Sequence, residues 1–144
     1  MLVQTILASM GNRDIIWLKP GDSIAQAARV MSENRIGACI VSTTGTDVAG
    51  ILSERDIVRE LGKRGSGILE DKIETIMTSK ITTCTSLEPL DAVLQTMTDG
   101  RFRHLPVVEE GKLIGLISIG DAVKGRLSEL SMEKDALEGM IMGH

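Results

Sequence analysis

Hydrophobic and polar positions along the chain repeat one pattern twice. In each half, a short apolar or β-branched run predicts a strand, and a segment with apolar positions at helical spacing follows it. Two more short apolar runs and a final helix complete each half, so the predicted order is β-α-β-β-α, twice. The predicted strands are 15–18, 38–41 and 48–52 in the first half, and 81–84, 104–108 and 113–117 in the second.

The first helix of each half has recognisable start and stop signals. Pro20-Gly21-Asp22 breaks the chain and can cap a helix from Ser23 to about Asn34, and Pro89 stands near the start of the corresponding helix, where its missing N–H costs nothing. Gly100 suits a left-handed turn at the end of that second helix. Residues 61–71, between the halves, are glycine-rich and charged, which predicts a linker.

The two halves are also similar residue by residue. The segment Gly50-Ile51-Leu52-Ser53-Glu54-Arg55-Asp56 recurs 65 residues later as Gly115-Leu116-Ile117-Ser118-Ile119-Gly120-Asp121. We therefore divide the chain into a first copy with its lead-in (1–65), a second copy (66–127) and a C-terminal tail (128–144). An apolar lead-in stands before each copy; its residues are Val3, Ile6 and Leu7, and then Ile73, Ile76 and Met77.

These residues resemble a tandem pair of CBS motifs, the unit also called a Bateman module. The resemblance rests on the two G-h-h-S-x-x-D segments, on Ile76-Met77-Thr78 and on Leu105-Pro106-Val107-Val108, and covers nearly everything from Val3 to about Leu127. It implies an α+β fold of two motifs related by a pseudo-two-fold axis, their sheets packed face to face, with two clefts between them. It also implies a homodimer.

Family members often bind adenosine-containing ligands in these clefts and regulate an attached or partner protein. The resemblance therefore implies AMP, ADP, ATP, NAD(H) or S-adenosylmethionine as the ligand, and a regulated protein that the sequence does not identify. Two rival functions remain open. One is a constitutive interaction or dimerisation module with vestigial clefts, and the other is a small enzyme that acts on a nucleotide.

The repeated S-x-x-D segments are the candidate ligand contacts. Ser53 and Ser118 stand where a strand passes into a helix, and the free N–H groups of a helix N-terminus favour phosphate. Asp56 and Asp121 follow in the first turn, where a carboxylate can accept hydrogen bonds from both hydroxyls of a ribose. The same spacing is that of a helix-capping box, so a purely structural role is the alternative.

Several cations and strand residues complete the candidate site. Arg55 can reach a phosphate, whereas its counterpart Gly120 cannot. If residues 101–103 are extended, Arg101 and Arg103 point to one side and form a phosphate clamp; the alternative is a solvated pair, or ion pairs with Glu109 or Glu110. These arginines favour the second copy slightly. His104 is a further candidate, or a packing residue. The resemblance adds contacts with the base through Ala38, Cys39, Thr83 and Pro106.

Composition narrows the function further. The net charge of −4 argues against a general nucleic-acid binder, and no apolar run approaches the roughly 20 residues that span a bilayer. The two cysteines form no cluster with metal-ligand spacing, so we expect no metal site. No local nucleophile–base motif or phosphate loop is present, so we expect a cytoplasmic, non-catalytic binding module.

The tail carries a narrow apolar seam at helical spacing. Its members are separated by 4, 3, 7 and 4 residues, with Lys134 in the long gap. Methionines nearby make a soft contact surface. We favour a dimer contact for this seam, and packing on its own domain is the alternative. The seam residues are Val123, Leu127, Leu130, Leu137 and Ile141.

Overall fold

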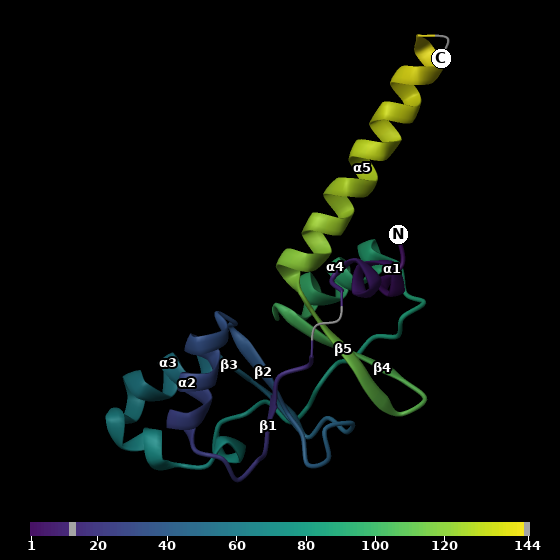
Figure 1. The fold of residues 1–144 in the computed structure, drawn as a ribbon. Helices are drawn as coiled ribbons and strands as arrows, with labels where there is room; N and C mark the ends of the chain where they lie inside the picture. Colours follow the sequence, from purple (N-terminus) through teal and green to yellow (C-terminus); the bar gives the residue numbers. More distant parts are fainter. Residues whose placement is uncertain (12–13, 143–144) are drawn as a thin grey trace. The chain divides into compact units, whose positions relative to one another are not determined.

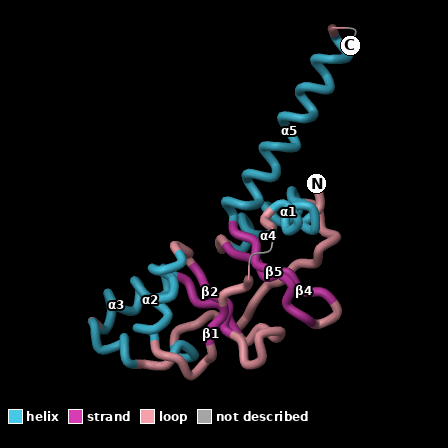
Figure 2. Tube along the Cα trace, in the orientation of Figure 1, coloured by secondary structure: helices cyan, strands magenta, loops and turns pink. Residues whose placement is uncertain are grey.

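The computed structural model describes residues 1–11 and 14–142 and has a mixed α and β architecture (Figures 1 and 2). The α+β class and the tandem repeat are confirmed. The first copy contains β1 (Trp17–Leu18), α2 (Ile24–Asn34), β2 (Ala38–Val41), β3 (Gly50–Ser53) and α3 (Glu54–Arg64). The second contains α4 (Leu90–Gly100), β4 (His104–Glu109), β5 (Lys112–Ser118) and α5 (Ile119–Ile141); α1 (Val3–Ser9) precedes both.

The strands are shorter than the sequence predicts at the start of each copy. In the first copy β1 pairs in parallel with β2, and β2 pairs antiparallel with β3, giving the order β1-β2-β3. In the second copy β4 and β5 form a two-stranded sheet. The predicted strand at 81–84 is wrong except at its last residue, because only Cys84 makes a bridge, with Val107 of β4.

The first helix of each copy buries the predicted stripe. Helix α2 begins one residue later than predicted, because Ser23 is its cap and accepts a hydrogen bond from the backbone N–H of Gln26 at 3.1 Å. The predicted role of Gly100 is wrong, because Arg101 takes the left-handed conformation after α4, with φ of 56°. A side chain at Gly100 would instead overlap the ring of Phe102. The buried residues of the two stripes are Ile24, Ala27 and Met31, and Leu90, Val93 and Met97.

The chain folds into two compact units that exchange their lead-in segments. The first-copy unit comprises residues 14–82 with 110–114, and the second-copy unit comprises the N-terminal segment, residues 83–109 and the chain from Gly115 onward. The division by contacts thus differs from the division by repeats. Ile73 and Ile76 pack in the core of the first copy, whereas Val3 and Ile6 pack in the core of the second.

This exchange gives the repeated glycine of each G-h-h-S-x-x-D segment a packing role. A Cβ atom at Gly50 would lie 2.6 Å from the sulfur of Met77 and 2.9 Å from the carbonyl oxygen of Thr78. A Cβ atom at Gly115 would lie 2.7 Å from a methyl carbon of Leu7. Each glycine therefore leaves room for the lead-in segment that stands before the other copy.

The predicted linker at 61–71 is wrong as a description of this segment. Helix α3 continues to Arg64, and two short 3₁₀ helices follow, η1 (Ser66–Glu70) and η2 (Ile73–Thr75). Ile68, within η1, is buried in the core of the first copy. Leu61 and Leu69 are partly buried against the same core, so three apolar residues hold this glycine-rich segment in the first copy.

The tail continues the last helix of the second copy without a break. Helix α5 packs against α4 and α1 near its start, where Ala122 and Gly125 are buried, and its distal part projects past them (Figure 1). Residues 143 and 144 of the predicted tail lie outside the described residues. No helix in the described part of the chain is long and apolar enough to cross a membrane.

Candidate functional site

The two S-x-x-D segments form the same hydrogen-bonded junction between a strand and a helix. The Ser53 hydroxyl accepts from the backbone N–H of Asp56 at 3.2 Å, and the Asp56 carboxylate accepts from the backbone N–H of Ser53 at 2.9 Å. Both distances are 3.1 Å for Ser118 and Asp121. Each pair is a complete capping box, so the structural role that the spacing allowed is present in both copies.

Each junction is tied to the start of the neighbouring strand. The backbone N–H of Glu54 donates to the carbonyl of Gly37 at 2.9 Å, and that of Ile119 donates to the carbonyl of Arg103 at 2.7 Å. The serine, the aspartate and the first residues of β2 or β4 are therefore held together in each copy. We call these groups the first junction and the second junction.

The strand residues of the first junction can offer only backbone atoms to a ligand. The side chains of Ala38 and Cys39 are buried, and β1 pairs with β2 from Ile40 onward. The backbone at the start of β2 thus extends beyond the paired part of β1. In the second junction Pro106 is likewise buried, whereas Thr83 is exposed next to the bridging Cys84.

Charged neighbours make the first junction crowded. The guanidinium of Arg59 donates to the second carboxylate oxygen of Asp56 at 3.0 Å, so both oxygens of this acid are engaged. The carboxylate of Glu54 lies over Gly37, 3.3 Å from where a Cβ atom would stand, and places a negative charge beside the strand. Arg55 is exposed, and the negative charge of the adjacent Glu54 offsets the positive charge that Arg55 brings to the junction.

Among the described residues, the second junction lacks the acid and the ion pair of the first: Lys124, three residues after Asp121, stands in the place of Arg59 but is not paired with that carboxylate. Ile119 and Gly120 stand in the places of Glu54 and Arg55, and within the described part of the chain the carboxylate of Asp121 makes only its capping bond. Arg101 and Arg103 are exposed, and in the described chain neither pairs with Glu109 or Glu110. The local charge at this junction therefore favours an anionic ligand more than that at the first.

The geometric argument for an arginine clamp is wrong in one respect. It assumed an extended backbone from 101 to 103, but Arg101 adopts the left-handed conformation as the cap of α4. The alternation of an extended chain therefore does not place its side chain on the side of Arg103. Arg103, whose own carbonyl is part of the junction, is the better placed of the two. His104, the first residue of β4, is partly buried.

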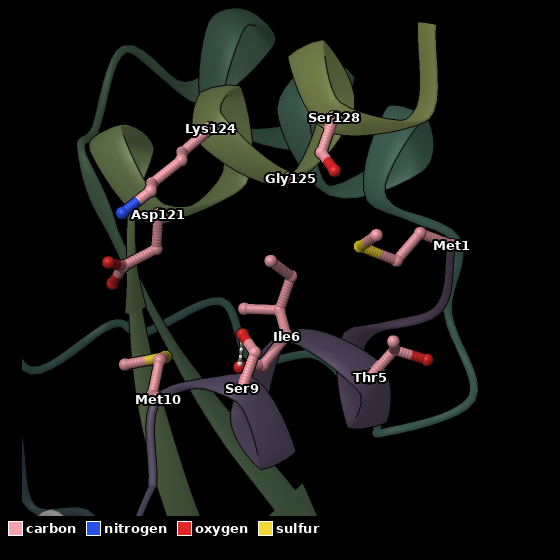
Figure 3. Close-up of a pocket in the computed structure, with 9 residues that line it drawn as sticks. All are labelled: Met1, Thr5, Ile6, Ser9, Met10, Asp121, Lys124, Gly125 and Ser128. Carbon is pink, nitrogen blue, oxygen red and sulfur yellow. Dashed lines mark hydrogen bonds between the residues drawn. The ribbon is translucent and has the colours of Figure 1, made fainter. Parts of the chain in front are cut away.

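A pocket of about 240 Å³ adjoins the second junction within the second-copy unit. Figure 3 shows Asp121 and Lys124 at one margin of this pocket and Ile6 near its middle. It is smaller than the roughly 300 Å³ at which most ligand pockets begin. Its lining is Met1, Thr5, Ile6, Ser9, Met10, Asp121, Lys124, Gly125 and Ser128.

The cysteines offer no reactive thiolate at neutral pH. Burial raises the pKa of Cys39 to about 11. Burial, together with the charge of Glu88, raises the pKa of Cys84 to about 12. Within the described residues, no group of three or more His, Cys, Asp and Glu side chains is arranged to hold a metal ion.

Two influential residues were missed by the sequence interpretation. Arg59 stands three positions after Asp56, a spacing at which side chains on a helix are neighbours. The ion pair between them could therefore have been predicted from the sequence. Glu54 could have been found by aligning the two copies, because the equivalent position in the second copy is the isoleucine Ile119. Arg59 follows the S-x-x-D segment and Glu54 is one of its two variable positions, and both residues act on the first junction only.

Comparison with known proteins follows the repeat. The family model described as CBS domain matches twice, at residues 7–63 and 73–128. The chain is 33% identical over 132 residues to CBS domain-containing protein CBSX3, mitochondrial, from Arabidopsis thaliana. That match covers 89% of this chain and 64% of the plant protein, so the chain spans less than two thirds of that relative.

Solved structures share the fold over most of the chain. The CBS-domain containing protein ATU1752 from Agrobacterium tumefaciens is 38% identical, with a TM-score of 0.83 over 88% of this chain and 99% of that one. PAE2072 from Pyrobaculum aerophilum, solved with AMP, is 25% identical, with a TM-score of 0.74 over 84% and 89%. The CBS pair of MJ0100, solved with 5′-methylthioadenosine and S-adenosyl-L-methionine, is 25% identical, with a TM-score of 0.74 over 93% and 98%.

Proposed function

Because this chain belongs to the CBS domain family, we propose that it is a regulatory module that binds an adenosine-containing ligand and modulates a partner protein. Two similar proteins, PAE2072 and MJ0100, were solved with AMP and with S-adenosylmethionine and methylthioadenosine. AMP, ADP, ATP, NAD(H) and S-adenosylmethionine share the adenosine group that this proposal requires. The observation that carries it is the repeated junction, in which a helix N-terminus, a serine and an aspartate are fixed beside a strand start.

The capping bonds leave each junction able to bind. A serine hydroxyl that accepts one hydrogen bond still has its own O–H to donate, for example to a phosphate oxygen. A carboxylate has two oxygens, and capping occupies one of them. At Asp121 the other oxygen is left for the hydroxyls of a ribose. At Asp56 that oxygen holds Arg59.

We therefore propose that the second junction is the stronger adenosine site. Ser118 and Asp121 supply the hydroxyl and the sugar acceptor, and Arg103, with Arg101 and His104 near it, supplies positive charge for a phosphate. Thr83 and Pro106 are proposed to flank the base. The first junction, with Ser53, Arg55, Asp56, Ala38 and Cys39, is proposed to bind more weakly, because a ligand must first displace Arg59 and approach Glu54.

Isothermal titration with AMP tests the sugar contact. Asp121→Asn keeps an oxygen for the cap but removes the charge, so we expect AMP affinity to fall about tenfold to a hundredfold. Asp56→Asn is the matched variant and should change the stronger binding event little. Arg59→Ala should strengthen the weaker event. Equal losses from both aspartate variants would contradict the proposed order of the sites.

A second titration separates the phosphate from the sugar. Arg103→Ala should weaken AMP binding and leave adenosine binding nearly unchanged, whereas Arg29→Ala, at an exposed arginine of α2, should change neither. Absence of heat and of any melting shift with all five ligands would overturn the proposal and favour a constitutive dimerisation module. Chemical conversion of the bound ligand during long incubation would favour an enzyme instead.

We further propose that the chain acts as a homodimer. The support is the exposed seam on α5, because apolar side chains on a projecting helix gain stability when a second surface covers them. The regulated protein is proposed to be a separate chain or segment that responds to the ligand-bound state.

A further inference from the structure

The apolar seam of α5 is exposed along its whole length. The exposed fractions are 42% for Val123, 62% for Leu127, 44% for Leu130, 59% for Leu137 and 85% for Ile141. The buried residues of the helix, Ala122 and Gly125, lie on another side of it. At about 100° per residue, the five seam residues stay within one narrow face, and Met132 lies on the opposite one.

Within the described residues, the projecting part of α5 lacks the packing contacts that stabilise most helices in proteins. Isolated helices shorter than about 12–15 residues, which is about the length of the projecting part of α5 from 128 to 141, are marginal in water, and most helices in proteins are stabilised by packing of an apolar face. The spacing of the seam alternates between 3 and 4 residues once Lys134 is included, which is the a/d pattern of a coiled coil. In this pattern Leu127, Lys134 and Ile141 take a positions, and Val123, Leu130 and Leu137 take d positions.

Charge decides the direction in which two copies of this helix fit together. In a parallel pair, Glu133 at g faces Glu138 at e of the second copy on both sides, and the two Lys134 side chains meet. In an antiparallel pair centred between Leu130 and Lys134, Lys124 faces Glu138 of the second copy at both ends. Lys134 then faces Leu130, and a single Glu133 pair meets at the centre.

We propose that α5 is a self-association surface, on which the α5 helix of a second copy of this chain packs antiparallel along the 123–141 seam. This arrangement joins Leu127 to Leu137 of the second copy and Val123 to Ile141, so every apolar seam residue except Leu130, which faces Lys134, meets another apolar residue. The seam spans about 27 Å at 1.5 Å per residue. The proposal is independent of ligand binding, because no seam residue belongs to either junction.

The test is the mass of the full chain by sedimentation across a concentration series. Leu137→Glu should weaken association more than about tenfold, because it removes a buried leucine from both ends and adds a charge. Met132→Glu is the matched control, on the opposite face of the same helix at 64% exposure, and should leave the mass unchanged. A wild-type chain that stays monomeric, or a Leu137→Glu variant that associates as wild type does, overturns the proposal.

The direction is tested by charge reversal. Glu138→Lys should weaken an antiparallel pair, by repulsion from Lys124, and the double variant Lys124→Glu with Glu138→Lys should restore it. In a parallel pair Glu138→Lys should strengthen association instead, because it would then face Glu133. That result, or the absence of restoration in the double variant, overturns the antiparallel arrangement. All variants should keep the wild-type melting cooperativity, which verifies that the body is folded.

Discussion

Substitution of Gly50 by alanine tests whether the glycine of the repeated motif is needed for close packing of the lead-in segment that contains Met77. The added Cβ atom would lie 2.6 Å from the Met77 sulfur and 2.9 Å from the Thr78 carbonyl oxygen. The side chain of methionine can move, but the Thr78 carbonyl is fixed, because it accepts from the N–H of Ile51 at 2.9 Å. Thr78 also donates back to the carbonyl of Ile51 at 2.9 Å, so the two backbones are locked together.

Overpacking of this kind destabilises by about 1–3 kcal/mol. For a chain of this size, that corresponds to a fall in Tm of roughly 3–10 °C. Gly115→Ala should cost less, because it meets only the end of the flexible Leu7 side chain. The free energy of unfolding, from denaturant titrations, measures both effects.

Gly62→Ala is the matched control and should have the opposite sign. Gly62 lies within α3 and has no atom within 4 Å of the position of a Cβ atom. Alanine there should stabilise by about 0.5–1 kcal/mol, because it restricts the unfolded chain and favours the helix. A Gly50→Ala protein as stable as the wild type would refute the packing argument.

Two further predictions concern groups away from the junctions. Cys39 and Cys84 should react with a thiol reagent at pH 8 only when the chain unfolds, because burial raises their pKa values to about 11 and about 12; rapid labelling of the folded protein would contradict this. Hydrogen bonds from Ser42, Thr43 and Thr44 lower the pKa of Asp47, so Asp47→Asn should lower Tm at pH 7. The difference from wild type should shrink as pH falls below about 4, since the stabilisation needs the ionised carboxylate; a difference independent of pH would contradict it.

Local periodicity was sufficient to predict the helices and most of the strands of each copy, but not the 3₁₀ helices after α3 or the single bridge at Cys84. The stripes of α2 and α4, the capping serines and the repeat are all properties of short segments, and neighbouring residues determine them. The pattern also identified Ile6 and Ile73 as members of the two apolar lead-ins, and both are buried in the structure. It did not indicate that each would complete the core of the other copy, because an apolar position states that a side chain is buried but not against which partner.

Backbone conformation explains the remaining errors. The sequence assigned the left-handed turn to Gly100 because glycine adopts this conformation at no steric cost. In the structure Arg101 adopts it, and Gly100 packs so closely against the ring of Phe102 that a Cβ atom would not fit. The non-glycine residue Arg35 ends α2 in the same conformation, with φ of 54°. Since both copies end this helix on an arginine, comparison of the copies would have been a better guide than the propensity of glycine.

The relation between capping and binding changes once the atoms of the junction are considered. The sequence presented them as rival roles for one serine and one aspartate. In the structure, capping uses one oxygen of Asp121 and the acceptor capacity of Ser118, and leaves the other oxygen and the hydroxyl proton for a ligand. A ligand at the second junction should therefore bind while the capping bonds stay intact, and should raise the melting temperature without loss of helix. At the first junction a ligand must first displace the guanidinium of Arg59 from the carboxylate of Asp56.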